Sequence, residues 1–95
     1  MKVEFSENQV SVMHKALDSW GLEAQIGVAV EEYAELIVAL QKYVNRSVKP
    51  STDELLDEIA DVEMMLAQVR IALGLDDELL HKRIESKFAK LSKYF

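Results

Sequence analysis

Apolar residues recur at helical spacing along most of this 95-residue chain, and breakers divide the pattern into separate helices. Ser6 followed by Gln9 has the spacing of a capping box, so a first helix is predicted over residues 7–19, ending at Gly21. The next apolar stretch predicts a second helix over residues 23–43. Its apolar residues occupy almost the whole circumference, which is typical of a helix that is buried on every side.

Two further helices are predicted after a short loop. Ser51 followed by Glu54 repeats the capping-box spacing and predicts a third helix over residues 52–73. Asp76 is the expected N-cap of a fourth helix over residues 77–94. The fourth helix carries an apolar stripe made of Leu79, Leu80, Ile84, Phe88 and Leu91.

Composition supports an all-α protein, because the chain contains three Gly and one Pro and no tract that reads as a long loop. Helices two and three should pack antiparallel, since the loop between them is short. We therefore expect a single all-α domain over residues 1–95, with an antiparallel four-helix, bundle-like fold. A chain this short leaves much apolar surface uncovered, so we also expect a homo-oligomer, a dimer or a tetramer.

Charge and hydropathy exclude several classes of function. The formal charge of −6 argues against binding a nucleic-acid polymer, which requires a basic surface, although small phosphorylated ligands can bind acidic sites through Mg²⁺. No apolar run approaches the length of about 20 residues that spans a bilayer. The absence of Cys rules out disulfides and thiolate chemistry. With no secretory signal at the N-terminus, a cytoplasmic protein without a membrane partner is expected.

Candidate chemistry comes from two pairs of acids at a spacing of three residues. Glu32 and Glu35 lie in the second predicted helix, and Glu58 and Asp61 lie in the third. Side chains three residues apart project from the same face of a helix, so each pair can act on one object. Glu31 adds a third acid beside the first pair.

The neighbours of these acids are unusual for charged residues. Both pairs lie on apolar stripes, and no base stands four residues from Glu32 or Glu35. A single pair of this kind usually marks a solvated face. Two such pairs on consecutive helices favour a different interpretation, in which the carboxylates have raised pKa values, basic partners or a bound cation.

The order of these motifs resembles a known family. Glu31-Glu32-Tyr33-Ala34-Glu35-Leu36 followed by Glu58-Ile59-Ala60-Asp61-Val62 is similar to the E-E-x-x-E-L and E-x-x-D-V motifs of the MazG-like all-α nucleoside triphosphate pyrophosphohydrolases. Trp20-Gly21, Gln25 and the Lys87-x-x-Lys90 segment also resemble parts of that family, so the resemblance covers roughly residues 14–94. The last helix departs from it, with Leu91 and Lys93 where many relatives carry Asn and Arg.

The resemblance implies an enzyme that cleaves a ribo- or deoxyribonucleoside triphosphate between the α- and β-phosphates, giving a monophosphate and pyrophosphate. The cofactor would be Mg²⁺, with Mn²⁺ as a substitute, held by Glu32, Glu35, Glu58 and Asp61. This agrees with the preference of Mg²⁺ for carboxylate and phosphate oxygens. Glu31, Glu35 and Glu58 are the candidate catalytic carboxylates, one of which would take a proton from the attacking water.

Substrate contacts are expected from four other residues. Trp20 and Gln25 are candidates for stacking on the base and hydrogen bonding to it, and Lys87 and Lys90 are candidates for the phosphates. Arg46 or Lys49 would reach the phosphates across a subunit boundary.

Two alternatives stay open. Phosphoribosyl-ATP pyrophosphohydrolase is similar in size and in its use of carboxylates, but its Leu and Tyr-His after the second acid pair are replaced here by Val62-Glu63-Met64-Met65. The other alternative is a non-catalytic helical interaction module, in which the acids would form a structural cluster at a dimer interface and no metal would be required.

Overall fold

The computed structural model describes residues 4–45 and 49–95, and these form an all-α structure of four helices without strands. Each helix ends within two residues of its predicted bounds. The helices are α1 (Glu7–Trp20), α2 (Leu22–Asn45), α3 (Thr52–Ala72) and α4 (Asp77–Ser92).

The predicted caps explain where the helices begin. At α1, the Gln9 backbone N–H donates to Ser6 Oγ over 3.1 Å, and the Ser6 N–H donates to Gln9 Oε1 over 2.8 Å, which completes the capping box. Ser51 Oγ accepts from the Glu54 N–H over 3.1 Å and caps α3. Between α1 and α2 the chain turns at Gly21, whose φ of 87° lies in the region that favours glycine.

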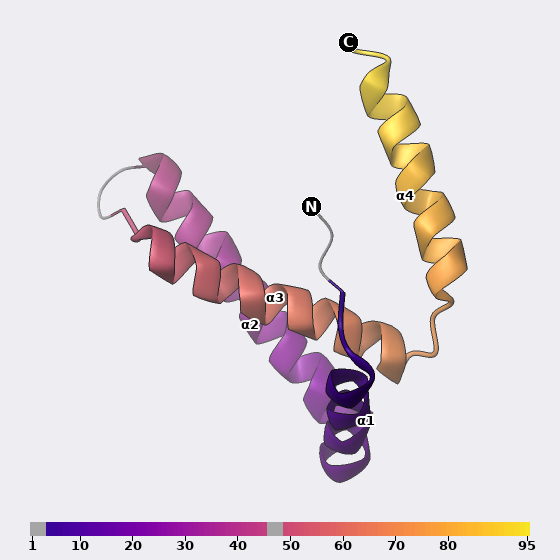
Figure 1. The fold of residues 1–95 in the computed structure, drawn as a ribbon. Helices are drawn as coiled ribbons and strands as arrows, with labels where there is room; N and C mark the ends of the chain where they lie inside the picture. The colour runs from indigo at the N-terminus through magenta and orange to yellow at the C-terminus, as the bar shows by residue number, and fades with distance from the viewer. Residues whose placement is uncertain (1–3, 46–48) are drawn as a thin grey trace.

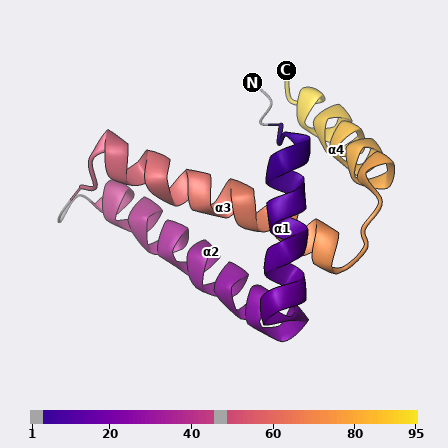
Figure 2. The ribbon, with the colours of Figure 1, turned by 60° about the horizontal axis from the view of Figure 1, so that its bottom comes forward.

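The centre of the fold is an antiparallel hairpin of α2 and α3, with α1 crossing the end at which α2 begins (Figures 1 and 2). Antiparallel packing of α2 on α3 was predicted and is confirmed. The core is small: the buried apolar side chains in the described part of the chain are Met13, Ala29, Met65 and Ala67.

One buried polar contact ties α2 to α3. Gln25 is 3% exposed, and its Oε1 accepts a hydrogen bond of 2.9 Å from Nε2 of Gln68. A buried amide oxygen is tolerated because this bond replaces the one it would make to water.

Replacing Gln25 with Leu is expected to destabilise the fold, because the Gln68 amide then lacks its acceptor. A partly buried donor without a partner costs about 1–2 kcal/mol, or a fall of about 5–15 °C in the unfolding temperature for a chain of this size. Thermal unfolding followed by circular dichroism measures the change. Replacing Gln25 and Gln68 together by Leu should recover most of the loss, and a double variant as unstable as the single one would contradict this explanation.

The predicted four-helix bundle is not closed within this chain. α4 projects away from the α2–α3 hairpin and has no fully buried residue, whereas α1, α2 and α3 pack on one another (Figures 1 and 2). The connection after α3, in which Gly74 has a φ of 63°, leads into α4, and no residue of α4 is buried against α1, α2 or α3. In residues 4–45 and 49–95, no helix is both long enough and apolar enough to cross a membrane.

Candidate metal centre

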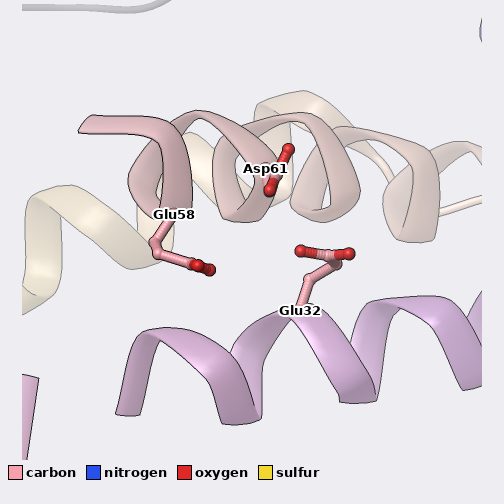
Figure 3. A group of neighbouring side chains, drawn as sticks. All are labelled: Glu32, Glu58 and Asp61. Atoms are coloured by element: carbon pink, nitrogen blue, oxygen red, sulfur yellow. The ribbon is translucent and has the colours of Figure 1, made fainter. Parts of the chain in front are cut away.

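Three carboxylates meet between the two central helices. Glu32 extends from α2 toward α3, and Glu58 extends from α3 toward α2, with Asp61 one turn further along α3 (Figure 3). One oxygen of each of the three side chains lies within 4.8 Å of one oxygen of the others. The structure therefore brings together acids from both predicted pairs.

The register of α2 against α3 places these side chains. Gln25 of α2 contacts Gln68 of α3. Seven residues further along α2 and seven residues back along α3, Glu32 approaches Asp61. Three residues beyond these, Glu35 lies beside Glu58. Every step forward on α2 is matched by an equal step backward on α3, as antiparallel helices require. We call Glu32, Glu35, Glu58 and Asp61 the acidic cluster.

Two oxygens of the acidic cluster are buried without a hydrogen-bond partner. They are Oε2 of Glu32 and Oε2 of Glu58, although both residues are only partly buried as a whole. A carboxylate oxygen that neither water nor a donor reaches is costly when the group is ionised. The cluster is therefore poorly satisfied by the protein alone.

The pKa shifts of Glu32 and Glu58 also indicate that their carboxylates are poorly satisfied. Burial raises the pKa of Glu32, and the nearby carboxylates of Glu35, Asp61 and Glu58 raise it further. Burial is also the main cause that raises the pKa of Glu58, followed by Glu35, Asp61 and Asp57. All of these influences favour the protonated acids.

A cation fits this donor set. The salt bridges found in the described residues include Arg70 with Asp77 and His81 with Glu85, and neither involves the acidic cluster. Oxygens that ligate Mg²⁺ octahedrally lie about 3–4 Å from one another, so small side-chain movements would bring three oxygens now within 4.8 Å to that spacing. Hard carboxylate ligands from these three side chains suit Mg²⁺ or Mn²⁺. Glu35, the fourth predicted ligand, lies beside Glu58 but is not one of the three.

A cavity of about 530 Å³ adjoins the acidic cluster. Glu35 and Glu58 line it on the side of the cluster, and the same two helices supply its apolar wall and one lysine, Lys42. The volume is in the range typical of small-molecule sites. The remaining lining residues are Ala34, Val38, Ala39, Pro50, Glu54 and Asp57.

The other predicted site residues do not converge on this cavity. Glu31 is exposed beside the acidic cluster. Trp20 is 68% exposed at the end of α1, so it lies at the opposite end of α2 from the cavity. Gln25 is enclosed between α2 and α3, where Gln68 occupies its amide oxygen.

The predicted basic contacts are likewise spread over the molecule. Lys87 and Lys90 lie on the projecting α4, outside the cavity lining. Lys49 lies over the ring of Tyr43, with Nζ 4.8 Å from the ring centre, and Arg46 lies outside the described residues.

Two residues of this region were not singled out from the sequence. Gln68 follows Asp61 by seven residues and lies on the same stripe of α3. That position could have indicated that Gln68 faces α2. Tyr33 has a buried hydroxyl without a hydrogen-bond partner, and burial raises its pKa, an effect that Arg70 partly offsets. Nothing in the sequence pattern distinguishes Tyr33 from an ordinary packing residue of α2.

Comparison with protein-family profiles, with curated proteins and with solved structures finds no match for this chain. Its chemistry must therefore be judged from the acidic cluster and the cavity beside it. Together they place a group of carboxylates beside a cavity of about 530 Å³.

Proposed function

We propose that this protein is a Mg²⁺-dependent nucleoside triphosphate pyrophosphohydrolase, which hydrolyses the bond between the α- and β-phosphates. One observation carries the proposal: carboxylates from two helices meet with buried oxygens that have no hydrogen-bond partner, and every neighbouring charge acts against their ionisation. A triphosphate brings about four more negative charges and would be repelled by this cluster unless a divalent cation lay between them.

Glu32, Glu35, Glu58 and Asp61 are the proposed metal ligands. Bound Mg²⁺, or Mn²⁺ in its place, would neutralise charge on the phosphates and lower the pKa of a coordinated water. The role of the protein is to hold the four carboxylates on two packed helices, so that they are already assembled before the substrate arrives.

The proton of the attacking water needs an acceptor. Glu35 is the best placed, since it belongs to the acidic cluster and also lines the adjoining cavity. Glu58 shares both properties, and Glu31 is exposed nearby. Water that loses its proton to one of these carboxylates attacks the α-phosphorus, and pyrophosphate leaves.

The cavity between α2 and α3 is the proposed site for the nucleoside part of the substrate. Its apolar wall suits the base and sugar, and Lys42 supplies one positive charge near the phosphates. Contacts from Trp20, Lys87 and Lys90 would have to come from a second copy of the chain, because none of the three lines this cavity.

A homo-oligomer belongs to the same proposal. Exposed apolar side chains run along the outer side of α2, among them Val30, Ile37 and Leu40. Association with another copy would cover them, and it would also enclose the open side of the cavity.

The alternatives differ in substrate and in metal dependence. Phosphoribosyl-ATP would be cleaved at the same kind of bond and shares the requirement for a carboxylate-bound metal. A non-catalytic interaction module would leave every triphosphate intact and would not respond to Mg²⁺.

Chromatographic analysis of the reaction products distinguishes the proposed activity from the two alternatives. The purified protein is incubated with a panel of ribo- and deoxyribonucleoside triphosphates and with phosphoribosyl-ATP, each with Mg²⁺ and with EDTA. We expect monophosphate and pyrophosphate from at least one triphosphate, abolished by EDTA. Turnover of phosphoribosyl-ATP alone would favour the first alternative, and no turnover of any substrate would favour the second.

A further inference from the structure

The surface of the single chain is too large for a folded monomer. Its accessible area is 7822 Å², whereas a monomer of 10.8 kDa is expected to expose about 5500 Å². The radius of gyration is 15.7 Å, against about 12 Å for a folded domain of this length. The excess of about 2300 Å² is what one partner buries in a large obligate interface rather than in a transient one.

Much of this excess lies around α4, which forms one wall of a trough of about 1300 Å³. The opposite wall comes from α1, the segment before it and the second half of α3 (Figure 2). Apolar side chains lie on both walls, with Val10, Met13 and Ile71 on one side and Leu80, Ile84 and Phe88 on the other. Charged side chains lie between them, among them Glu78, Lys82 and Glu85 on α4. Phe88 is 64% exposed and Ile84 is 44% exposed.

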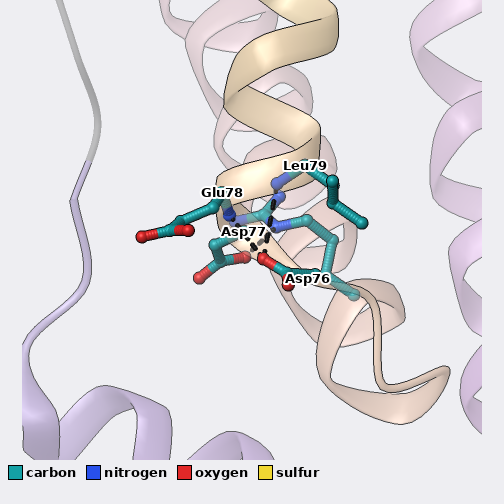
Figure 4. Close-up of polar contacts among 5 residues, drawn as sticks. Asp76, Asp77, Glu78 and Leu79 are labelled. Carbon is teal, nitrogen blue, oxygen red and sulfur yellow. Dashed lines mark hydrogen bonds and ion pairs between the residues drawn. The ribbon is translucent and has the colours of Figure 1, made fainter.

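The start of α4 is capped by its own residues and contacts α3 through one ion pair. Oδ1 of Asp76 accepts from the N–H groups of Glu78 and Leu79 over 2.8 and 3.3 Å (Figure 4). Arg70 of α3 pairs with Asp77 at 3.5 Å. A well-capped amphipathic helix with no buried residue of its own needs a partner to cover its stripe.

The two ends of α4 differ in charge, and Lys82, Arg83 and Glu85 add further charges between them. Asp76, Asp77 and Glu78 make the first turn acidic, with Arg70 as a nearby cation. Lys87, Lys90 and Lys93 make the last turns basic. Two copies of α4 placed antiparallel would bring each acidic end to a basic end, whereas a parallel pair would bring like charges together; the helix dipoles favour the same choice.

The apolar stripe is also nearly symmetric about its middle. Apart from Leu79, its members follow one another at intervals of four, four and three residues, from Leu80 through Ile84 and Phe88 to Leu91. In an antiparallel pair centred beside Ser86, Leu80 of one copy faces Leu91 of the other, and Ile84 faces Phe88. A surface that complements itself in this way is what a two-fold dimer requires.

From these observations we infer that α4 is a self-association element: α4 of one copy lies antiparallel to α4 of a second copy, and its apolar stripe fills the trough between α1, α3 and α4. This contact is separate from the exposed side of α2 and does not depend on the proposed catalytic activity.

Single cysteines test the orientation, and the chain has none of its own. Leu80→Cys and Leu91→Cys are prepared as two separate proteins. Three samples, each variant alone and the two mixed, are unfolded and refolded so that copies exchange, and are then oxidised. In the mixture, the dimers that contain one copy of each variant should become covalent, and each variant alone should give little covalent dimer. Covalent dimers from each variant alone would indicate a parallel pair, and no covalent dimer from the mixture would exclude the contact; either result overturns the inference.

Phe88→Glu tests the surface by a different measurement. A charge at the centre of a buried interface should weaken association at least about 30-fold, so the mass measured by sedimentation should fall to half. Val12→Glu is the matched control, because Val12 is an exposed apolar residue of α1 outside the trough. Circular dichroism confirms that both variants stay helical. An unchanged mass for a helical Phe88→Glu protein would overturn the inference.

Discussion

Replacing Glu58 with Gln is expected to reduce Mg²⁺-dependent release of pyrophosphate by at least about a thousand-fold. Glu58 belongs to the acidic cluster and also lines the adjoining cavity. Its Oε2 is buried without a hydrogen-bond partner. The amide keeps the shape of the side chain but cannot supply an anionic ligand. Steady-state rates at saturating Mg²⁺, together with metal affinity from calorimetry, measure both losses.

Stability should change in the opposite direction. Without metal, Glu58 is repelled by Glu35 and Asp61, and glutamine removes that repulsion and can donate to Glu35. The unfolding temperature of the metal-free variant should therefore equal or exceed that of the natural protein. Loss of activity together with an unchanged or higher unfolding temperature would show that the Glu58 carboxylate serves function rather than stability.

Glu63→Gln is the matched control for this variant. Glu63 lies on the same helix five residues further on, but it lines the trough beside α1 and α4 rather than the acidic cluster. It should retain activity and metal affinity. Equal turnover by Glu58→Gln and the natural protein would show that the metal-ligand assignment is wrong.

Magnesium is expected to stabilise the fold strongly at pH 8 and only weakly at pH 5. Free metal at 100 times its dissociation constant contributes about 2.7 kcal/mol, which for a chain of this length raises the unfolding temperature by about 10–20 °C. Metal binding requires ionised carboxylates, so protonation of Glu32 and Glu58 competes with it. Differential scanning fluorimetry with Mg²⁺ and with EDTA measures the difference across this pH range.

The metal-free protein should follow the reverse trend. In the unfolded chain both carboxyls titrate near 4.5, and folding raises the pKa of each. The folded state therefore holds protons that the unfolded state has released, and their contribution to stability is present below about pH 4.5 and lost as pH rises through the raised values. Glu32→Gln should flatten the pH dependence, and an EDTA-treated protein that gains stability from pH 5 to 8 would contradict the assignment.

The positions of the helices were predictable because they depend on local chemistry. The capping box of Ser6 with Gln9, the caps at Ser51 and Asp76 and the turn at Gly21 involve residues at most four apart. Such signals are present in the sequence itself, and the structure confirms each of them to within two residues.

The place of α4 was not predictable in the same way. Its apolar stripe indicates that one face of the helix must be covered, but not by which part of which chain. The bundle expected from four amphipathic helices would require α4 to pack closely on α1, α2 or α3, and in the described part of the chain it does not.

The candidate site was predictable in part. Two acid pairs on apolar stripes of neighbouring antiparallel helices indicated that carboxylates would meet, and Glu32, Glu58 and Asp61 do so. Gln25 illustrates the limit, since its polar side chain on a packing face suggested contact with a base. Its partner Gln68 is 43 residues away in the sequence, and only the register of α2 on α3 brings the two together.

The most direct test of the proposed chemistry is ³¹P NMR of triphosphate hydrolysis in ¹⁸O-labelled water, with Mg²⁺ and with EDTA. Attack on the α-phosphorus predicts monophosphate and pyrophosphate as the only products, with ¹⁸O in the monophosphate and no turnover in EDTA. Release of orthophosphate, ¹⁸O in pyrophosphate, or equal turnover in EDTA would contradict a carboxylate-bound metal that directs cleavage between the α- and β-phosphates.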